Sequence, residues 1–226
     1  MTRLNRSRLL FGDTGIKKLQ NATVMVVGCG AVGSFAIEGL ARSGVGHLVV
    51  VDFDCVEETN INRQLFALDS TLGQKKVCVA QERIKDINPD ITVDALDLFF
   101  DENTEISVKP DFIIDAIDTV ESKIALYKWA ASHNVQIISS MGAASKTDIS
   151  QIKIGMLSKT SVCPLASRVR RMMRDLGLSD IPVVYSTQTP QPVTGHAKNL
   201  GSVITVTGVF GLMLANYVIG KITQDF

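Results

Sequence analysis

The stretch Thr23-Val24-Met25-Val26-Val27-Gly28-Cys29-Gly30-Ala31-Val32-Gly33 decides the fold that this sequence predicts. Its first five residues are β-branched or apolar and predict a buried strand. Three glycines follow at G-x-G-x-x-G spacing. The first permits a tight turn, the second lets the backbone approach a phosphate, and the third allows a helix to pack closely on the strand. The N–H groups at the start of that helix point at negative charge. We therefore predict a nucleotide-binding turn formed by Gly28, Gly30, Ala31, Val32 and Gly33.

A second apolar run, His47–Val51, is followed directly by Asp52. This is the distance at which an acidic residue bonds the ribose hydroxyl of a bound nucleotide. The glycine pattern alone is a weak signal that many proteins carry. Together with Asp52 after a second strand, it favours a nucleotide site.

Predicted strands alternate with predicted helices along the first two thirds of the chain. The strands are expected at 23–27, 47–51, 91–96, 111–116 and 135–139, and the helices at 33–43, 73–88 and 120–133. This alternation is typical of βαβ units, so we predict an α/β fold with a Rossmann-like, mostly parallel sheet flanked by helices. Ligands of such sheets lie at the carboxyl ends of the strands. Gly28, Asp52, Asp118 and Gly142 fall at those ends, so four segments are expected to meet in one crevice.

The pattern changes after Gly142. Strands are expected at 151–156 and 182–185, a short basic helix at 164–176, a loop at 186–200 and an almost wholly apolar segment at 202–219. That apolar segment is long enough to span a bilayer. Its small residues and its polar Thr205, Thr207 and Asn216 suit tight helix packing equally well. We therefore predict a C-terminal extension of mixed strands and an apolar helix.

The composition is that of an ordinary soluble α/β protein: 226 residues, 46% hydrophobic, 20% charged, with a net charge of zero. We expect a single domain with an arm at 1–22, a nucleotide-binding core at 23–142 and a C-terminal part at 143–226. Because the chain is not basic overall, any contact with RNA has to come from a local patch. The four scattered cysteines argue against structural zinc and disulfides and favour a cytoplasmic protein. No apolar signal core follows the basic residues 1–8.

The segment from Asp52 to Gln64 contains polar and charged side chains, Asn60, Arg63 and Gln64, that a hydride-transfer enzyme does not need. Arg63 is suited to neutralise charge that develops on a phosphate, and Lys76 supplies a second cation from the next helix. Asp118 is suited to Mg²⁺, which prefers carboxylate and phosphate oxygens. The alternative is a set of solvated loop charges, which their convergence on one crevice disfavours. We therefore predict a site for nucleotidyl transfer.

Four motifs occur in the order seen in the ThiF/MoeB/HesA superfamily, the bacterial relatives of ubiquitin-activating enzymes. They are G-C-G-A-V-G from Gly28, D-F-D-C-V-E-E-T-N-I-N-R-Q from Asp52, G-Q-K-K-V from Gly73 and D-A-I-D-T-V from Asp115. The chain resembles this family from Arg3 to about Gly142. The resemblance implies an enzyme that adenylates a carboxylate with ATP.

The resemblance also implies a role for each matching residue. Gly30 and Gly33 would lie in the nucleotide loop, Asp52 on the ribose, Asn60, Arg63 and Lys76 on phosphates and Asp118 on Mg²⁺, with Asp54 and Gln64 in the same cofactor-binding set. Arg3-Leu4-Asn5-Arg6 resembles an element that donates an arginine to the other subunit, so Arg6 is expected to act in trans in a homodimer. The catalytic set is then Arg6, Arg63, Lys76 and Asp118. The apolar C-terminal segment would pack on the sheet near the dimer interface, which argues against a membrane span.

The C-terminal third narrows the resemblance to one branch. C-P-L-A-S-R-V-R from Cys163, V-V-Y-S-T-Q-T-P from Val183 and N-L-G-S from Asn199 resemble the TcdA or CsdL branch, the tRNA threonylcarbamoyladenosine dehydratases. Members of that branch lack zinc-binding cysteine pairs, as this chain does. The resemblance implies that ATP activates the free carboxylate of the threonylcarbamoyl group on a tRNA adenosine. The carbamoyl group then closes a ring with loss of AMP, and because it is already tethered, no protein nucleophile is needed.

Two residues depart from the branch. Cys163 stands where an acidic residue is common, and His196 lies about where some members have a cysteine. Cys163 is a candidate acceptor of a thioester or of sulfur, against the alternative of a half-buried thiol. His196 is a weak candidate for a phosphate or RNA contact. A basic cluster, formed by Arg168, Arg170, Arg171 and Arg174, is either a solvated helix face or the local patch that holds the tRNA backbone.

Two other functions stay open at this point. One is a ThiF- or MoeB-type adenylyltransferase that activates the C-terminus of a ubiquitin-like sulfur carrier, with a sulfur-carrier or desulfurase partner. The other is a non-catalytic or redox protein that binds a dinucleotide. The C-terminal match and the missing zinc cysteines favour the dehydratase over the first. The positive charge of Arg6, Arg63 and Lys76 disfavours the second, because a dinucleotide pyrophosphate needs fewer cations.

Overall fold

The computed structural model describes residues 3–192 and 200–224 of the chain. A seven-stranded sheet forms the centre, in the order β3-β2-β1-β4-β5-β7-β6. The strands are β1 (Thr23–Val27), β2 (His47–Asp52), β3 (Thr92–Asp97), β4 (Phe112–Asp115), β5 (Gln136–Ser140), β6 (Ile152–Met156) and β7 (Pro182–Ser186). All neighbouring strands run parallel except β6 and β7, which are antiparallel. The predicted Rossmann-like sheet and its mixed C-terminal extension are confirmed.

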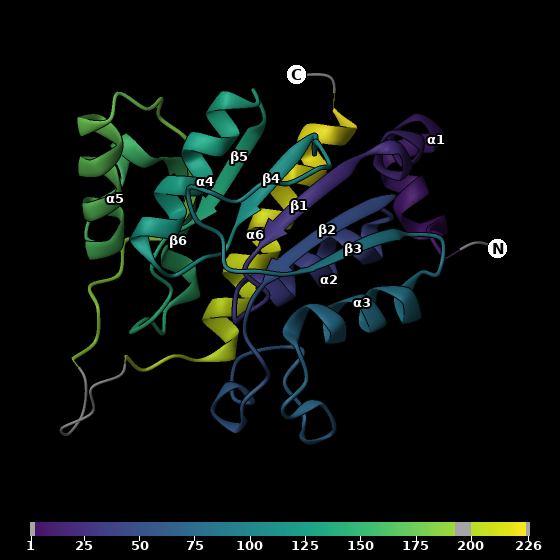
Figure 1. Ribbon diagram of the computed structural model, residues 1–226, viewed down its shortest axis with the longest axis horizontal. Helices are drawn as coiled ribbons and strands as arrows, with labels where there is room; N and C mark the ends of the chain where they lie inside the picture. Colours follow the sequence, from purple (N-terminus) through teal and green to yellow (C-terminus); the bar gives the residue numbers. More distant parts are fainter. Residues whose placement is uncertain (1–2, 193–199, 225–226) are drawn as a thin grey trace.

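Helices cover both faces of the sheet (Figure 1). The face that contains Val24 and Val26 packs on α1 (Asn5–Asn21), α2 (Gly33–Ser43), α3 (Lys76–Ile87) and α6 (Ile204–Thr223). The face that contains Met25 and Val27 packs on α4 (Val120–Ser132) and α5 (Pro164–Asp175). Successive side chains of β1 point to opposite faces, and both faces are covered, so the strand is apolar along its length.

The apolar segment at the C-terminus is a core helix in this structure. Among the described residues, α6 alone is long and apolar enough to cross a membrane, and half of its apolar stretch is buried inside the protein. Phe210 and Leu214 are fully buried between α6 and the sheet. A Cβ on Gly211 would lie 2.2 Å from the carbonyl oxygen of Val32, so the small residue allows α6 to approach α2 closely. Packing on the rest of the fold therefore accounts for the length of this segment.

The start of one helix differs from the sequence-based expectation, and another helix is interrupted. The helix expected from Gly73 starts at Lys76, because Gly73 has a φ of +78° and its N–H donates to the carbonyl oxygen of Val56 at 2.9 Å. Long-range pairing with the segment after β2 thus replaces the first helical turn. In α1 the chain is interrupted at Gly12, whose φ of 69° and ψ of 178° are not helical.

Candidate functional site

The glycine turn joins β1 to α2 where the strand order reverses, between β1 and β4. Gly28 has a φ of +97°, and a Cβ there would lie 2.7 Å from the carbonyl oxygen of Ala116 in the segment after β4. A Cβ on Gly33 would lie 1.7 Å from the carbonyl oxygen of Gly28. The first hydrogen bond of the helical turn runs from the Ser34 N–H to the Gly30 carbonyl at 3.0 Å. The N–H groups just before Ser34 are therefore available to an anion.

Asp52, the last residue of β2, holds this turn in place. Its Oδ2 accepts the Cys29 N–H at 2.6 Å and its Oδ1 accepts the Asp54 N–H at 2.8 Å. Burial raises the pKa of the Asp52 carboxyl above its ordinary value, although these hydrogen bonds and the nearby Lys76 oppose the shift. A carboxylate has four lone-pair sites, so these two bonds leave capacity for the ribose hydroxyl that the sequence predicts as its partner.

Lys76 begins α3, and it is 5% exposed. Its Nζ donates to Asp54 Oδ2 at 2.8 Å, and its N–H donates to the Asp54 carbonyl oxygen at 3.0 Å. The Asp54 side chain is 47% exposed. The structure therefore brings the predicted residues Asp52, Asp54 and Lys76 together beside the glycine turn. Lys76 is paired with the half-exposed carboxylate of Asp54.

The loop after β2 carries Arg63. The Nη1 of Arg63 donates to the carbonyl oxygen of Thr59 at 2.7 Å and to Asn62 Oδ1 at 2.9 Å. Because a guanidinium has five N–H donors, the Nη2 and Nε groups remain for a phosphate. Asn60 is buried and its Oδ1 accepts the Glu57 N–H at 3.2 Å, which closes the short helical turn before Arg63.

Two further side chains of this loop connect it to the rest of the site. Gln64 is buried, and its Nε2 lies 3.8 Å from the position of a Cβ on Gly30, so its amide covers the glycine turn. Asn62 Nδ2 donates to the carbonyl oxygen of Ser202 at 3.1 Å, just before α6. The same amide that contacts Arg63 is thus fixed by the C-terminal third of the chain. The local sequence pattern does not indicate this role of Asn62, because its partner lies 140 residues away in the chain.

Asp118 follows β4 and is exposed to solvent. The described residues contain no cluster of three or more His, Cys, Asp or Glu that could hold a metal ion by themselves. Mg²⁺ commonly binds through one or two carboxylates together with substrate phosphates and water. A single exposed carboxylate at the carboxyl end of β4, beside the glycine turn, fits that donor set.

A fully buried ion pair lies behind Asp118, and the sequence analysis did not identify it. Lys123 of α4 and Asp115 of β4 are both 0% exposed, with Nζ and Oδ2 2.8 Å apart. Ser139 Oγ and the Tyr127 hydroxyl also donate to Asp115 Oδ2, at 2.6 and 2.8 Å. Burial, reinforced by the Asp115 charge, raises the pKa of Tyr127 well above its usual range. The available signal was a charged residue at the end of an apolar strand, followed by a lysine within an apolar helix.

Arg6 lies away from these residues. It is exposed near the start of α1, next to Leu4, which packs against Gly44 before β2. Figure 1 shows α1 beside the amino ends of the strands, at the opposite end from the segment that carries Arg63. The structure therefore does not bring Arg6 to the site of its own chain.

The predicted residues of the C-terminal third have different environments. Cys163 is buried and only 5% exposed, with its Sγ 3.3 Å from the position of a Cβ on Gly142, so this candidate acceptor is largely shielded from solvent. Lys146, which the sequence pattern did not single out, is also buried and its Nζ donates to the Gln188 carbonyl; desolvation lowers the pKa of the Lys146 ammonium. His196 lies outside the described residues.

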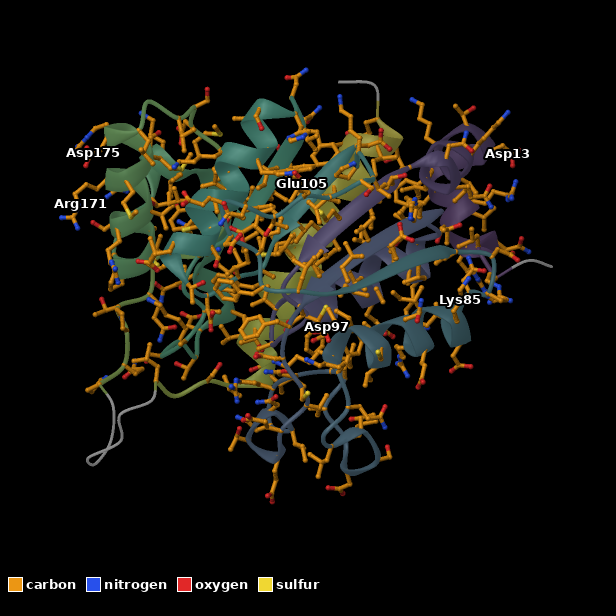
Figure 2. The ribbon with its side chains drawn as sticks, in the orientation of Figure 1. Asp13, Lys85, Asp97, Glu105, Arg171 and Asp175 are labelled. Carbon is orange, nitrogen blue, oxygen red and sulfur yellow. The ribbon has the colours of Figure 1, made fainter. Side chains whose placement is uncertain are left out.

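The basic cluster on α5 is smaller than the sequence suggested. Arg170 Nη1 donates to the carbonyl oxygen and the hydroxyl of Thr160, at 2.9 and 2.8 Å, so it holds the turn before α5. Arg168, Arg171 and Arg174 are exposed at i, i+3 spacing. Figure 2 shows Arg171 pointing away from the body of the protein. Three arginines rather than four thus face solvent.

Comparisons with known proteins agree with this architecture. The sequence profile described as the ThiF family matches residues 4–225. A Bacillus subtilis protein named tRNA threonylcarbamoyladenosine dehydratase is 46% identical over 190 residues, which cover 82% of this chain and 75% of that protein. A Haemophilus influenzae protein of the same name is 36% identical over 253 residues, covering 99% and 97%. The crystal structure of E. coli tRNA N6-threonylcarbamoyladenosine dehydratase in complex with ATP matches with a TM-score of 0.91 and 32% identity, covering 97% of this chain and 93% of that one.

Proposed function

The chain belongs to the ThiF family, and we propose that it is an ATP-dependent dehydratase that cyclises the threonylcarbamoyl group on a tRNA adenosine. The observation that carries this proposal is the extent of the similarity. Relatives named for this activity match the C-terminal third as well as the nucleotide-binding core. A carrier-protein adenylyltransferase shares the adenylating chemistry and is the second candidate. The third candidate, a dinucleotide-binding protein, does not explain Arg63 and Lys76, because a dinucleotide pyrophosphate needs fewer cations.

The chemistry needs two steps. The carboxylate of the threonylcarbamoyl group attacks the α-phosphorus of ATP, pyrophosphate leaves, and an acyl adenylate forms. The carbamoyl group of the same modification then attacks the acyl carbon, and AMP leaves with the oxygen that the carboxylate has lost. The carbamoyl group gives up its proton to solvent or to a base, so the net change in the nucleoside is the loss of one water. Tethering raises the effective concentration of the attacking group, which removes the need for a nucleophile on the protein.

The cations of the site support the first step. Negative charge builds on the phosphate oxygens as the carboxylate adds, and a fixed cation lowers the energy of that transition state. Arg63 presents Nη2 and Nε while Thr59 and Asn62 hold its Nη1. Lys76 is fixed at the first turn of α3 and faces Asp54. Asp52 would bind the ribose, and the glycine turn would accept the phosphates.

Asp118 would hold Mg²⁺ against the phosphates. The ion would supply Lewis-acid stabilisation of the leaving pyrophosphate. Arg6 would complete the cation set of a neighbouring subunit in a homodimer, because α1, the helix that carries it, lies beside the amino ends of the strands in its own chain (Figure 1). The C-terminal part, 143–226, would contribute to substrate binding and to the dimer interface.

The tRNA would contact α5 through Arg168, Arg171 and Arg174, since a chain without net charge needs a local basic patch to attract a phosphate backbone. We expect the protein to act in the cytoplasm. Because Cys163 is buried, a sulfur-carrier or desulfurase partner would bind without a covalent bond to this thiol.

The test is a reaction of the protein with ATP, Mg²⁺ and tRNA that bears the linear threonylcarbamoyl modification. The tRNA is digested and its nucleosides are analysed by mass spectrometry. We expect the modified nucleoside to lose the mass of one water, with AMP and pyrophosphate as products, and to remain unchanged when ATP is omitted. An unchanged nucleoside in the complete reaction would reject the dehydratase. Pyrophosphate exchange that requires a carrier protein and ignores the tRNA would instead establish the second candidate.

A further inference from the structure

The buried ion pair between α4 and β4 joins three segments at the carboxyl ends of the strands. Lys123 Nζ donates to Asp115 Oδ2 at 2.8 Å, to Ser139 Oγ at 3.1 Å and to the carbonyl oxygen of Ser140 at 2.8 Å. An ammonium has three hydrogens, so every donor of this lysine is used. Its acceptors lie on β4 and β5, two neighbouring parallel strands.

Stability alone does not explain this arrangement. Burying two charges costs about as much as their attraction returns, and apolar side chains of similar volume are often equally stable. What a saturated polar cluster provides is fixed geometry, because each of its members accepts only one arrangement of its neighbours. All buried side-chain N and O atoms of the described residues have a hydrogen-bond partner, this cluster included.

The cluster controls the segment that leads to Asp118. Asp115 uses Oδ2 for Lys123 and Oδ1 to accept the Ile117 N–H at 3.0 Å. On its other side, the Ala116 N–H donates to the Val27 carbonyl at 2.9 Å, directly before the glycine turn. The backbone between Asp115 and Asp118 is therefore held between the nucleotide loop and the ion pair.

The cluster also reaches the segment that leads to Gly142. The Ser140 carbonyl accepts from Lys123, and the Met141 N–H donates to the Val184 carbonyl on β7 at 2.8 Å. The hydroxyl of Tyr127, one turn after Lys123, lies 2.8 Å from both Asp115 Oδ2 and Ser139 Oγ and so repeats the connection between the two strands. One helix thus sets the spacing of the two strand ends.

We propose that Lys123 is a positioning residue: by bonding Asp115 and Ser140 together, it holds the Asp118 segment at a set distance from the Gly142 segment. The first segment lies on the phosphate side of the site and the second opens toward the C-terminal part. This spacing aligns the α-phosphorus with the incoming carboxylate. The proposal rests on the proposed function for the identity of that carboxylate, and on the buried cluster alone for the geometry.

The test compares the wild type with the double variant Lys123→Met/Asp115→Asn, which removes both charges and preserves the side-chain volumes. A misplacement of about 1 Å costs about 100-fold in rate, so we expect kcat with the modified tRNA to fall by about that factor. The glycine turn, Arg63 and Lys76 lie outside the cluster, and Asp118 would contribute to ATP binding only through Mg²⁺, so the Kd of ATP measured without Mg²⁺ should change by less than about threefold. Lys128→Met, an exposed lysine of the same helix, is the matched control and should behave as the wild type.

Hydrogen–deuterium exchange gives a readout that does not depend on the substrate. In the double variant, peptides that cover residues 115–118 and 139–142 should both exchange faster, while those of the glycine turn keep their protection. Faster exchange with unchanged kcat would show a merely structural cluster and overturn the proposal, as would unchanged exchange of both segments. A wild type that is inactive on the tRNA rejects the dehydratase, and the exchange experiment then still decides the positioning claim.

A milder variant covers the case in which the double variant does not fold. Ser139→Ala keeps both charges and removes three hydrogen bonds of the cluster: those that Ser139 Oγ accepts from Lys123 and from the Tyr127 hydroxyl, and the one that it donates to Asp115. The loss of a single hydrogen bond corresponds to about a fivefold change, so we expect kcat to fall by at least about that factor while the Kd of ATP measured without Mg²⁺ stays the same. Equal kcat values for Ser139→Ala and the wild type would overturn the proposal.

Discussion

Two lysines at the carboxyl ends of the strands are each paired with an aspartate at 2.8 Å, and the two pairs lie in different surroundings. Lys76 is buried, but its partner Asp54 is 47% exposed. Lys123 and Asp115 are both fully buried. A pair at the rim exchanges its partner for a ligand at little cost, whereas an enclosed pair leaves an uncompensated charge when either member is lost. We call the surroundings of Lys76 and Asp54 the rim, and those of Lys123 and Asp115 the interior. The rim is suited to binding a ligand, and the interior is suited to fixing the positions of the strand ends.

The largest expected effect on stability breaks the interior pair. Asp115→Ala leaves the Lys123 ammonium buried without its counterion, which costs about 3–5 kcal/mol of unfolding free energy. Asp54→Ala is the matched variant at the half-exposed pair; because water takes the place of the lost carboxylate there, it should cost about 1–2 kcal/mol. Urea unfolding of both variants measures the difference. Equal losses for the two aspartates would mean that burial does not distinguish the pairs.

The largest expected effect on rate is at the rim. Arg63→Ala removes a preorganised cation from the phosphates and should raise the barrier by about 2–4 kcal/mol, a slowing of about 30- to 1000-fold. Single-turnover kinetics with the modified tRNA measure this, and circular dichroism checks that the fold is retained. A rate near that of the wild type would remove Arg63 from the catalytic set.

Lys76→Met tests binding at the same rim. The loss of a charge-assisted hydrogen bond to phosphate costs about 1.5–3 kcal/mol, so the Kd of ATP should rise by about 10- to 100-fold with little loss of stability. Lys75 is the control, because its Nζ bonds Asp97 at 3.0 Å and the carbonyl oxygen of Phe53 at 2.9 Å rather than Asp54. In Lys75→Met the Kd of ATP should stay within about twofold of the wild type. Calorimetric titration decides whether the two neighbouring lysines differ.

Asp52 lies between the rim and the interior. The dependence of the unfolding free energy on pH shows how strongly burial affects its carboxyl group. Its folded-state pKa is raised by burial above the ordinary 3.8, so the folded protein holds this proton more tightly than the unfolded chain does. The unfolding free energy should therefore decrease as the pH rises from about 3.8 through the folded pKa, and level off above it. Asp52→Asn should remove this slope. Urea unfolding at a series of pH values measures it, and identical slopes for both proteins would contradict the assignment.

The smallest expected effect is on tRNA binding and concerns the arginines of α5, which lie outside both the rim and the interior. Arg168→Ala with Arg171→Ala should weaken tRNA binding and reduce its dependence on salt by about one unit of slope for each phosphate that an arginine no longer neutralises. The Kd of ATP should not change. Filter binding at several salt concentrations measures this. Unchanged affinity at low salt would leave α5 as a solvated surface.

Much of the rim was predictable, because its residues follow each other closely after strands that the sequence marks clearly. The run Val24–Val27 and the glycine spacing predict strand, turn and helix, and Gly28 and Gly33 occupy positions that exclude a side chain. Asp52 and Asp54 follow the next strand directly. Arg63 and Lys76 were identified by charge in an expected crevice; the structure places Lys76 beside the glycine turn, and Arg63 directly precedes Gln64, whose amide covers that turn. Boundaries were less exact, since long-range pairing removed the first turn of α3.

The interior was not predictable in the same way. Lys123 reads as one charged residue among apolar neighbours, and nothing in the local pattern indicates that Ser139 and Ser140 receive its hydrogens. Asn62 likewise reads as one more polar loop residue, although its amide joins Arg63 to Ser202. Arg170 resembles its neighbours on α5 in the sequence, but its guanidinium holds the turn at Thr160.

The sequence by itself determined the class of fold, the nucleotide loop and the positive charge around it, because each follows from residues within a few positions of one another. Only the tertiary structure decided that Lys123 and Asp115 are enclosed, that Arg170 is bonded within the protein, and that the apolar C-terminal segment packs as α6. These properties depend on desolvation and on contacts between residues far apart in the chain. Local periodicity indicates neither desolvation nor long-range contacts. The same lysine is a solvated surface charge or a buried, fully hydrogen-bonded one, according to the residues that pack around it.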